Sequence, residues 1–382
     1  MALSTKSIFD PLRNRTDPTP RRHDEPTFDF YDRCSNEVIG SIRDLLEGWF
    51  SHYPKGRHQR DLVGRLRDGD GRQWNSGAWE LYVHETLRLF GYTMTPHPRL
   101  TTTNRRIDFL AVRGPERVLV ECVTVGHSDE ASVRRGGIGA LEAAIDRSGM
   151  LDYWLDLQFD RVGPAPIPPE PFVEDLRSWI AAQDIDALNG ISHRGGLPSF
   201  DWDHDEWLVH VWAIPRSPEL RGSEDIRPLG IIAGDDDDKS VWLALRAAME
   251  SKAEAYGELD APYVVAVNAP DAWPDHEEVE LAVFGDLPFT RHWRRDGFLM
   301  RADGTSHSGL SGVLLGTGIQ PQTFSRYWPT LYENPAASRP LPDSLQWRRV
   351  RIVRDGPTTV EGVKPPALFG IAQDWPGRPW PK

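Results

Sequence analysis

Lysine, cysteine and long apolar runs are all scarce in this sequence of 382 residues. The two cysteines, Cys34 and Cys122, lie far apart in the chain. This argues against a disulfide scaffold and a cysteine-based zinc site, and indicates a reducing compartment. No apolar stretch approaches the roughly 18 residues of a membrane span, and the first residues lack the apolar segment of a secretion signal. The sequence thus predicts a cytoplasmic protein with no membrane partner.

The net charge of −13 argues against a chain that coats nucleic acid nonspecifically. It does not exclude a local basic groove. Arginine supplies most of the 44 basic residues, so a site that requires a lysine has few candidates. Lysine stands only at Lys6, Lys55, Lys239, Lys252, Lys364 and Lys382.

Helical and extended segments alternate along the chain, which predicts a mixed α/β fold. Helices are expected over residues 36–53, 78–92, 131–149, 170–184 and 240–259. Strands are expected over residues 92–100, 105–114, 117–125, 151–162, 206–217, 228–234, 261–270 and 308–316. The predicted organisation is a polar N-terminal arm (1–35), an α/β domain (36–270) and a C-terminal extension or accessory region (271–382).

Two carboxylates interrupt adjacent apolar runs. Asp108 stands before "FLAV", and Glu121 lies inside "VLVECVTV", where a charge is costly unless a partner compensates it. If the two runs form a hairpin around "RGPER", the carboxylates can share one face of adjacent strands. A divalent metal is then the usual way to offset their repulsion. The alternative is that Asp108 pairs with Arg105 or Arg106 at a strand edge.

A helix with Glu, a strand with Asp and a strand with Glu-x-Lys occur in this order in the PD-(D/E)XK nucleases, also called restriction-endonuclease-like. This sequence resembles that superfamily through Glu80 in "WELYVHETLRLFGY", Asp108 in "RRIDFLAV" and Glu121 in "VLVECVTV". The "RRID" stretch stands where many members have Pro-Asp. The resemblance covers about residues 74–160 and implies a restriction-endonuclease-like core sheet flanked by helices.

The resemblance also implies a phosphodiesterase site that holds Mg²⁺ or Mn²⁺. Asp108, Glu121 and the backbone carbonyl of Cys122 would be the ligands, with Glu80 bound directly or through water. The metal would polarise a phosphate and help lower the pKa of an attacking water. Glu85 follows on the same predicted helix and is the alternative inward carboxylate. We expect one of these two glutamates to be at the surface.

The position of the motif lysine, two residues after Glu121, is occupied by Val123. Valine can neither orient water nor stabilise charge on a phosphate. A cation could instead come from another element: Lys252 is the leading lysine, and Arg134 or Arg135 could supply charge without acting as a base. Alternatively, the site works slowly through metal alone, or it is inactive and the fold is retained for binding. The predicted catalytic set is Glu80, Asp108, Glu121 and Lys252.

Arginines surround the proposed site in the sequence, which fits contacts to nucleic-acid phosphates. The predicted contacts are Arg105, Arg106, Arg134 and Arg135, and Arg113 and Arg117 also flank the two acids. An ordinary solvated face is the alternative for Arg134 and Arg135.

The predicted function is therefore metal-dependent cleavage of nucleic acid, with DNA as the favoured substrate. The resemblance alone implies a setting in prokaryotic restriction or defence against phage. Many nucleases of this class dimerise to cut both strands, so a homodimer is also implied. The alternative is a catalytically inactive nuclease-like module that binds nucleic acid or a protein partner. A third possibility, an enzyme acting on a small nucleotide, requires a closed pocket.

Overall fold

The computed structural model divides the chain into two compact units. Unit 1 contains residues 1–20, 26–126 and 238–382, and unit 2 contains residues 21–25 and 127–237. None of the described helices is both long enough and apolar enough to cross a membrane. The structure describes residues 7–100, 105–125, 129–163, 168–188, 196–223, 228–229, 238–253, 255–257, 259–271, 279, 283–284, 297–299, 307–353 and 356–378.

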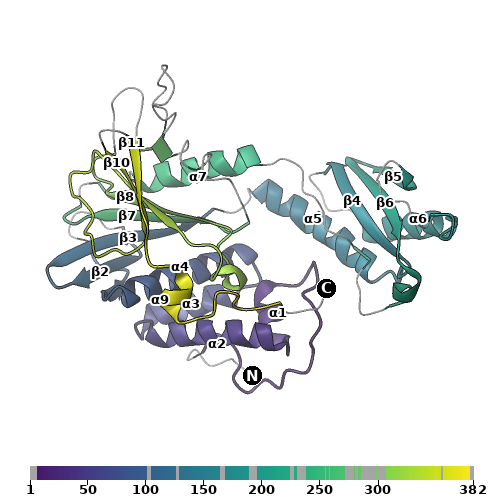
Figure 1. Ribbon diagram of the computed structural model, residues 1–382, viewed down its shortest axis with the longest axis horizontal. Coiled ribbons are helices and arrows are strands. Elements are labelled where there is room, and N and C mark those ends of the chain that lie inside the picture. Colours follow the sequence, from purple (N-terminus) through teal and green to yellow (C-terminus); the bar gives the residue numbers. More distant parts are fainter. Residues whose placement is uncertain are drawn as a thin grey trace. The chain divides into compact units, whose positions relative to one another are not determined.

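Unit 1 is built on a mixed sheet of eight described strands in the order β1-β2-β3-β7-β8-β9-β10-β11 (Figure 1). β1, β2 and β3 pair antiparallel, whereas β3, β7 and β8 run parallel. β9 is antiparallel to β8 and parallel to β10, and β11 forms an antiparallel edge. The strands are β1 (Thr93–Pro96), β2 (Phe109–Arg113), β3 (Glu116–Thr124), β7 (Tyr263–Ala269), β8 (Gly312–Thr317), β9 (Thr330–Glu333), β10 (Arg348–Val353) and β11 (Gly356–Val360).

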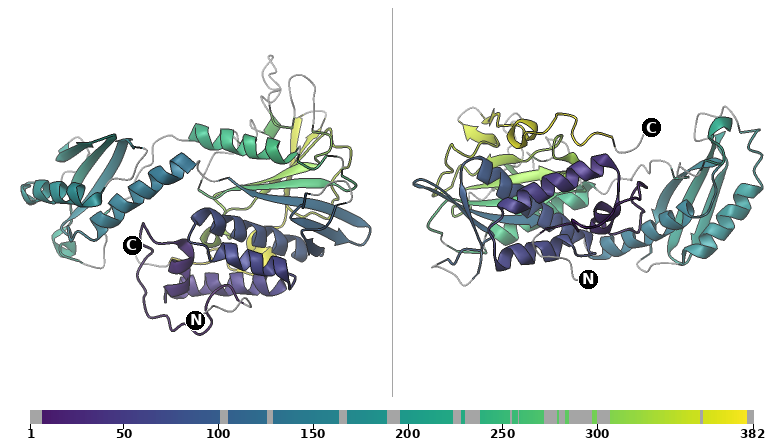
Figure 2. Two further views of the ribbon diagram at one scale, coloured as in Figure 1. Left: turned by 180° about the vertical axis from the view of Figure 1, so that it is seen from behind. Right: turned by 90° about the horizontal axis from the view of Figure 1, so that it is seen from below.

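Different helices cover the two faces of this sheet, as Figure 2 also shows. Alternate strand side chains point to opposite faces and so separate two apolar cores. Val120 and Ala266 pack in the core that contains α2 and α4, whereas Leu119 and Val265 pack with α7. The helices of unit 1 include α1 (Thr27–Arg33), α2 (Glu37–His52), α3 (Arg57–Leu66), α4 (Gly71–Leu89), α7 (Asp238–Ala253) and α9 (Pro365–Phe369).

α4 is held closely between the sheet and α3. Its N-terminus is capped by Asp70, whose side chain accepts a hydrogen bond from the backbone N–H of Arg72. The indole N–H of Trp79 donates to the carbonyl oxygen of Ala266 in β7, 2.9 Å away. On the other side, a Cβ at Gly77 would lie only 2.9 Å from the buried side chain of Leu66 in α3. The absence of a side chain at position 77 therefore allows α3 and α4 to approach.

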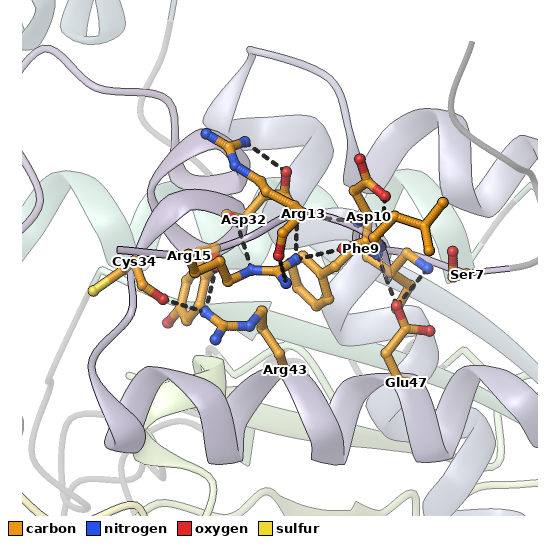
Figure 3. A network of polar contacts seen from close by, with 12 residues as sticks. Ser7, Phe9, Asp10, Arg13, Arg15, Asp32, Cys34, Arg43 and Glu47 are labelled. Carbon is orange, nitrogen blue, oxygen red and sulfur yellow. Dashed lines mark hydrogen bonds and ion pairs between the residues drawn. The ribbon is translucent and has the colours of Figure 1, made fainter. Parts of the chain in front are cut away.

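The N-terminal segment packs on unit 1 from residue 7 onward, rather than extending as the expected arm. Glu47 in α2 accepts hydrogen bonds from the backbone N–H groups of Ile8 and Phe9, at 2.8 and 2.7 Å. Asp32 accepts from Arg13 and Arg15, at 2.7 and 2.8 Å (Figure 3). Ile8 and Phe9 are buried in the core next to α4. The polar contacts therefore hold these two apolar side chains in the core.

Unit 2 is a smaller layer of three described strands in the order β4-β6-β5. α5 and α6 pack on one face of this sheet through a separate apolar core. Residues 21–25 join this unit because His23 contacts Glu142 and Asp146 of α5, at 2.9 and 3.3 Å. Hydrogen bonds to these two carboxylates raise the pKa of His23 to about 9. The elements are α5 (Asp129–Asp146), β4 (Tyr153–Arg161), α6 (Pro169–Ala181), β5 (Ser199–His204), β6 (Trp207–Pro215) and η2 (Pro218–Leu220).

The expected mixed α/β class is confirmed, and the expected helices and most expected strands are present. The boundaries of the expected core, residues 74–160, differ from the structure, because β4 belongs to the sheet of unit 2. The expected domain over residues 36–270 is likewise interrupted by unit 2. The unexpected helices and strands are α1, α3, α9, β5, β9, β10 and β11. The strand predicted over residues 228–234 lies almost wholly outside the described residues.

Substitution of Gly77 by alanine should destabilise the protein, because the new methyl group meets Leu66 in a full core. We expect a loss of about 1 kcal/mol in the free energy of unfolding. The matched control is Gly64→Ala in α3, where a Cβ has open space around it. This change should stabilise the helix by up to about 1 kcal/mol. Urea denaturation of both variants measures the difference, and equal effects would contradict the packing described here.

Candidate functional site

Glu121 is a buried carboxylate in the middle of β3, and Lys252 of α7 supplies its counter-charge. The side chain of Glu121 is 6% exposed, and its Oε1 atom accepts a hydrogen bond from Nζ of Lys252 at 2.6 Å. Val123, two residues further on, packs among the apolar residues of the same face. Lys252, the leading lysine candidate in the sequence, thus contacts Glu121 from α7. Tyr263 of β7 steadies the end of α7, because its hydroxyl donates to the carbonyl oxygen of Lys252.

Asp108 immediately precedes β2 and lies across from Glu121, since Phe109 pairs with Val120. Its Oδ2 atom accepts a hydrogen bond from the backbone N–H of Cys122 at 2.7 Å. The carboxylate therefore accepts the hydrogen bond that a backbone carbonyl oxygen would accept if the pairing of β2 with β3 continued. This contact holds Asp108 beside the segment that carries Glu121. The expected hairpin is present, and its register places Asp108 next to the strand segment that carries Glu121. That the two acids form one site stays a prediction.

The surroundings of Asp108 disfavour its ionised form. Burial is the main cause, followed by the negative charges of Glu121 and Glu80, and together they raise the pKa of Asp108 to about 8. The hydrogen bond from Cys122 and the charge of Arg65 act in the opposite direction without cancelling the shift. The site therefore holds more acidic groups than its own cations neutralise, and it is suited to an additional positive charge.

Glu80 reaches the same region from α4 but is bound to protein partners. Its carboxylate accepts hydrogen bonds from the hydroxyl of Tyr53, at 2.7 Å, and from the guanidinium of Arg65. Glu85 is buried as well, with ion pairs to His52 and Arg88 at 3.1 and 2.8 Å. The expectation that one of the two glutamates would be at the surface is wrong. α4 is enclosed by α2, α3 and the sheet, so residues on several of its faces are buried, and both glutamates are among them.

His97 contacts the site although no sequence pattern assigned it a role. It follows β1 with a φ of 46°, a left-handed conformation that is uncommon for residues other than glycine. Its backbone N–H donates to the carbonyl oxygen of Asp108 at 2.7 Å, and its Nδ1 atom lies 3.7 Å from the Asp108 carboxylate. Its ring also contacts the ring of His58 in α3 at a tilt of 46°, with centroids 4.5 Å apart. Burial lowers the pKa of His97, so a neutral imidazole faces Asp108.

The predicted arginines fall into three places. Arg105 and Arg106 are exposed just before Asp108, and Arg105 donates to the carbonyl oxygen of Ala255. Arg113 and Arg117 lie at the turn of the β2–β3 hairpin instead. At about 3.3 Å per residue, this turn is some 15 Å from Asp108, so their expected place beside the acids is wrong. Hairpin geometry separates residues that are close in sequence.

Arg134 and Arg135 belong to α5 of unit 2, and their side chains lie outside the described part of the structure. The prediction that they contact nucleic acid stays a prediction.

The described residues contain no group of three or more His, Cys, Asp or Glu side chains arranged as ready metal ligands. Two observations nevertheless fit a hard cation beside Asp108 and Glu121. Within the described part of the chain, the buried Oε2 atom of Glu121 accepts no hydrogen bond of normal geometry. In addition, burial and the neighbouring acids raise the pKa of Asp108. Glu80 is the one predicted ligand whose carboxylate is already engaged on both oxygens.

Comparison with protein-family models, with curated proteins and with solved structures found no match to this chain. The geometry of the site is therefore the basis for assigning a function.

Replacing Asp108 by asparagine should change the pH dependence of stability in EDTA. The unfolded chain loses this proton near pH 3.9, whereas the folded protein keeps it up to about pH 8. The group therefore lowers stability progressively as pH rises through this range. Relative to wild type, Asp108→Asn should gain about 4 kcal/mol between pH 5 and pH 8. Thermal unfolding at both pH values measures this gain.

The control for this experiment is Asp260→Asn, which changes an exposed carboxylate paired with Arg117. Its effect should be small and similar at both pH values. An equal shift for Asp108→Asn at pH 5 and pH 8 would contradict the charge crowding inferred for the site.

Proposed function

We propose that this protein is a metal-dependent phosphodiesterase that cleaves nucleic acid, with duplex DNA as the favoured substrate and a restriction-endonuclease-like core in unit 1. The observation that carries the proposal is the 2.6 Å contact between Lys252 and Glu121. It supports the hypothesis that the motif lysine, replaced by Val123 on β3, has been supplied by α7.

The order of elements supports the same proposal. A helix with Glu80, a strand preceded by Asp108 and a strand with Glu121 are followed by α7 and the parallel strand β7. Unit 2 is inserted between β3 and α7, so the helix that follows β3 in the core is separated from it by about a hundred residues. Unit 1 therefore has the helix–strand–strand–helix order of the superfamily that the sequence resembles.

Mg²⁺ or Mn²⁺ fits the chemistry of the site. Asp108, Glu121 and the carbonyl oxygen of Cys122 would hold it, and Glu80 would act through water because its oxygens are engaged by Tyr53 and Arg65. Oxygen ligands are those that these ions prefer. A bound ion would supply polarisation of the phosphate and a lower pKa for an attacking water.

Hydrolysis requires several contributions from the protein itself. A water oxygen bonds to phosphorus, the bond from phosphorus to the leaving oxygen breaks, and one proton leaves the water while another reaches the leaving oxygen. Lys252 places a positive charge beside Glu121, where negative charge grows on the phosphate oxygens. Neutral His97, beside Asp108, can accept a proton from a water molecule in the site. The exposed Arg105 and Arg106 would hold flanking phosphates.

Two observations favour the alternative of a catalytically inactive binding module. Glu80 is fully engaged, and the described residues contain no preformed set of three metal ligands. A site of two carboxylates and a carbonyl oxygen binds a divalent ion more weakly than one with three acids. The inactive module predicts DNA binding without turnover.

The proposal is tested by incubating supercoiled and linear DNA with Mg²⁺, with Mn²⁺ and with EDTA. Wild type should cut only with a divalent ion. Glu121→Gln and Asp108→Asn should each reduce the rate by at least about 10²-fold, because each removes a carboxylate that would hold the metal ion at the reacting phosphate. Lys252→Met should lose a similar factor, while Lys252→Arg keeps the charge and should retain part of the activity.

Glu116→Gln is the matched control, since Glu116 lies at the other end of β3 and contacts Tyr92. It should cut like wild type. Binding of DNA by wild type without any cutting would favour the inactive module, and cutting that survives Glu121→Gln would refute the assigned site.

A further inference from the structure

The segment from residue 54 to residue 67, which includes α3, is basic within an acidic chain. Its sequence "PKGRHQRDLVGRLR" contains a single acidic residue, Asp61, whereas the whole chain has 57 acidic and 44 basic residues. Lys55, Arg57 and Arg60 are exposed. We call these three residues the α3 basic face. Leu62, on the other side of α3, is buried in the core that contains α4.

The stability of α3 does not account for these cations. Positive charges in the first turn of a helix oppose the helix dipole. The first turn of α3 nonetheless begins with Arg57 and contains no acid, and Gly56 provides no side-chain cap. Arg57 pairs with Asp61 at 3.5 Å, but both side chains are largely exposed, at 75% and 56%. Such a pair contributes little. The sequence therefore places positive charge where folding alone disfavours it.

The flank of α3 joins this face to the candidate site. The ring of His58 contacts the ring of His97, whose Nδ1 atom lies 3.7 Å from the Asp108 carboxylate. Arg65, near the end of α3, binds Glu80. Arg57 and Arg60 of this face are thus on the helix that borders the acids, and Lys55 lies just before it. Glu80 and Glu121 themselves are only 2% and 4% exposed.

We propose that the α3 basic face binds the phosphate backbone of duplex DNA and holds it against the site. This inference rests on the proposed function, and it names a surface to which no sequence motif assigns a role. A protein of net charge −13 repels DNA at long range, so binding requires a local group of cations beside the buried acids. Lys55, Arg57 and Arg60 provide that group without occupying the catalytic positions.

The test is binding of a fluorescent duplex of about two helical turns, measured by anisotropy in EDTA so that no cleavage occurs. The triple variant K55A/R57A/R60A should bind at least tenfold more weakly than wild type at about 100 mM salt. The slope of log K against log salt should fall by roughly 2 to 3, since each lost phosphate contact accounts for about 0.9. Its melting temperature should equal or exceed that of wild type, because the substitutions relieve the unfavourable charges at the helix start.

The control is K364A/R113A/R326A, which removes one lysine and two arginines from other exposed positions of unit 1. It should change affinity less than twofold. An unchanged salt slope in the α3 variant, an equal loss in the control, or a fall in melting temperature that parallels the loss of binding would overturn the proposal. So would tighter binding of single-stranded DNA or RNA than of the duplex, or no DNA binding by wild type.

The outcomes separate this proposal from the proposed function. Tight DNA binding that depends on the α3 basic face, with no cutting under any metal condition, would support the binding role of this face and refute the nuclease activity. Metal-dependent cutting, together with wild-type affinity of the α3 variant for DNA, would support the nuclease activity and refute the binding role of the face.

Discussion

The ion pair between Glu121 and Lys252 is the interaction on which the rest of the site depends. A carboxylate buried in a central strand is costly unless a cation compensates it, and here the cation comes from a helix that follows a long insertion in the sequence. The pair attaches α7 to β3. It also places the positive charge of Lys252 near Asp108 and Glu80, which add negative charge to the site. Sheet, helix and site are thus linked through one contact.

The site also combines two faces of the sheet at one strand end. Glu121 and Lys252 lie on the α7 side, whereas Glu80 approaches from α4. Asp108 connects them, because it immediately precedes β2 and accepts the hydrogen bond of the Cys122 N–H. Since β2 begins only at Phe109, the acids from both faces can influence one another there.

Much of the local structure could be predicted from the sequence. The apolar runs "RVLVECVTV" and "APYVVAVNAP" correspond to β3 and β7, and the helix with Glu80 corresponds to α4. Glu121 could be singled out as a candidate because an acid inside an apolar run must have a compensating partner. Lys252 could be named as a candidate only because lysine is so rare in this chain.

The remaining features depend on contacts that sequence patterns do not encode. Lys252 and Glu121 are separated by 131 positions, and nothing local marks residues 127–237 as an inserted unit. Tyr53 and Arg65 meet Glu80 through helix packing, so neither carries a motif. His97 is the exception: a histidine between two prolines at the end of a strand is where the chain must turn, and it could have been found.

The central claim is that Asp108 and Glu121 form a site for a divalent cation, and calorimetric titration with Mn²⁺ tests it most directly. Wild type should bind one equivalent, Glu121→Gln and Asp108→Asn should each weaken binding by at least tenfold, and Glu116→Gln should bind like wild type. Binding that is unaffected by Glu121→Gln, or no binding of Mn²⁺ by the wild-type protein, would contradict the account.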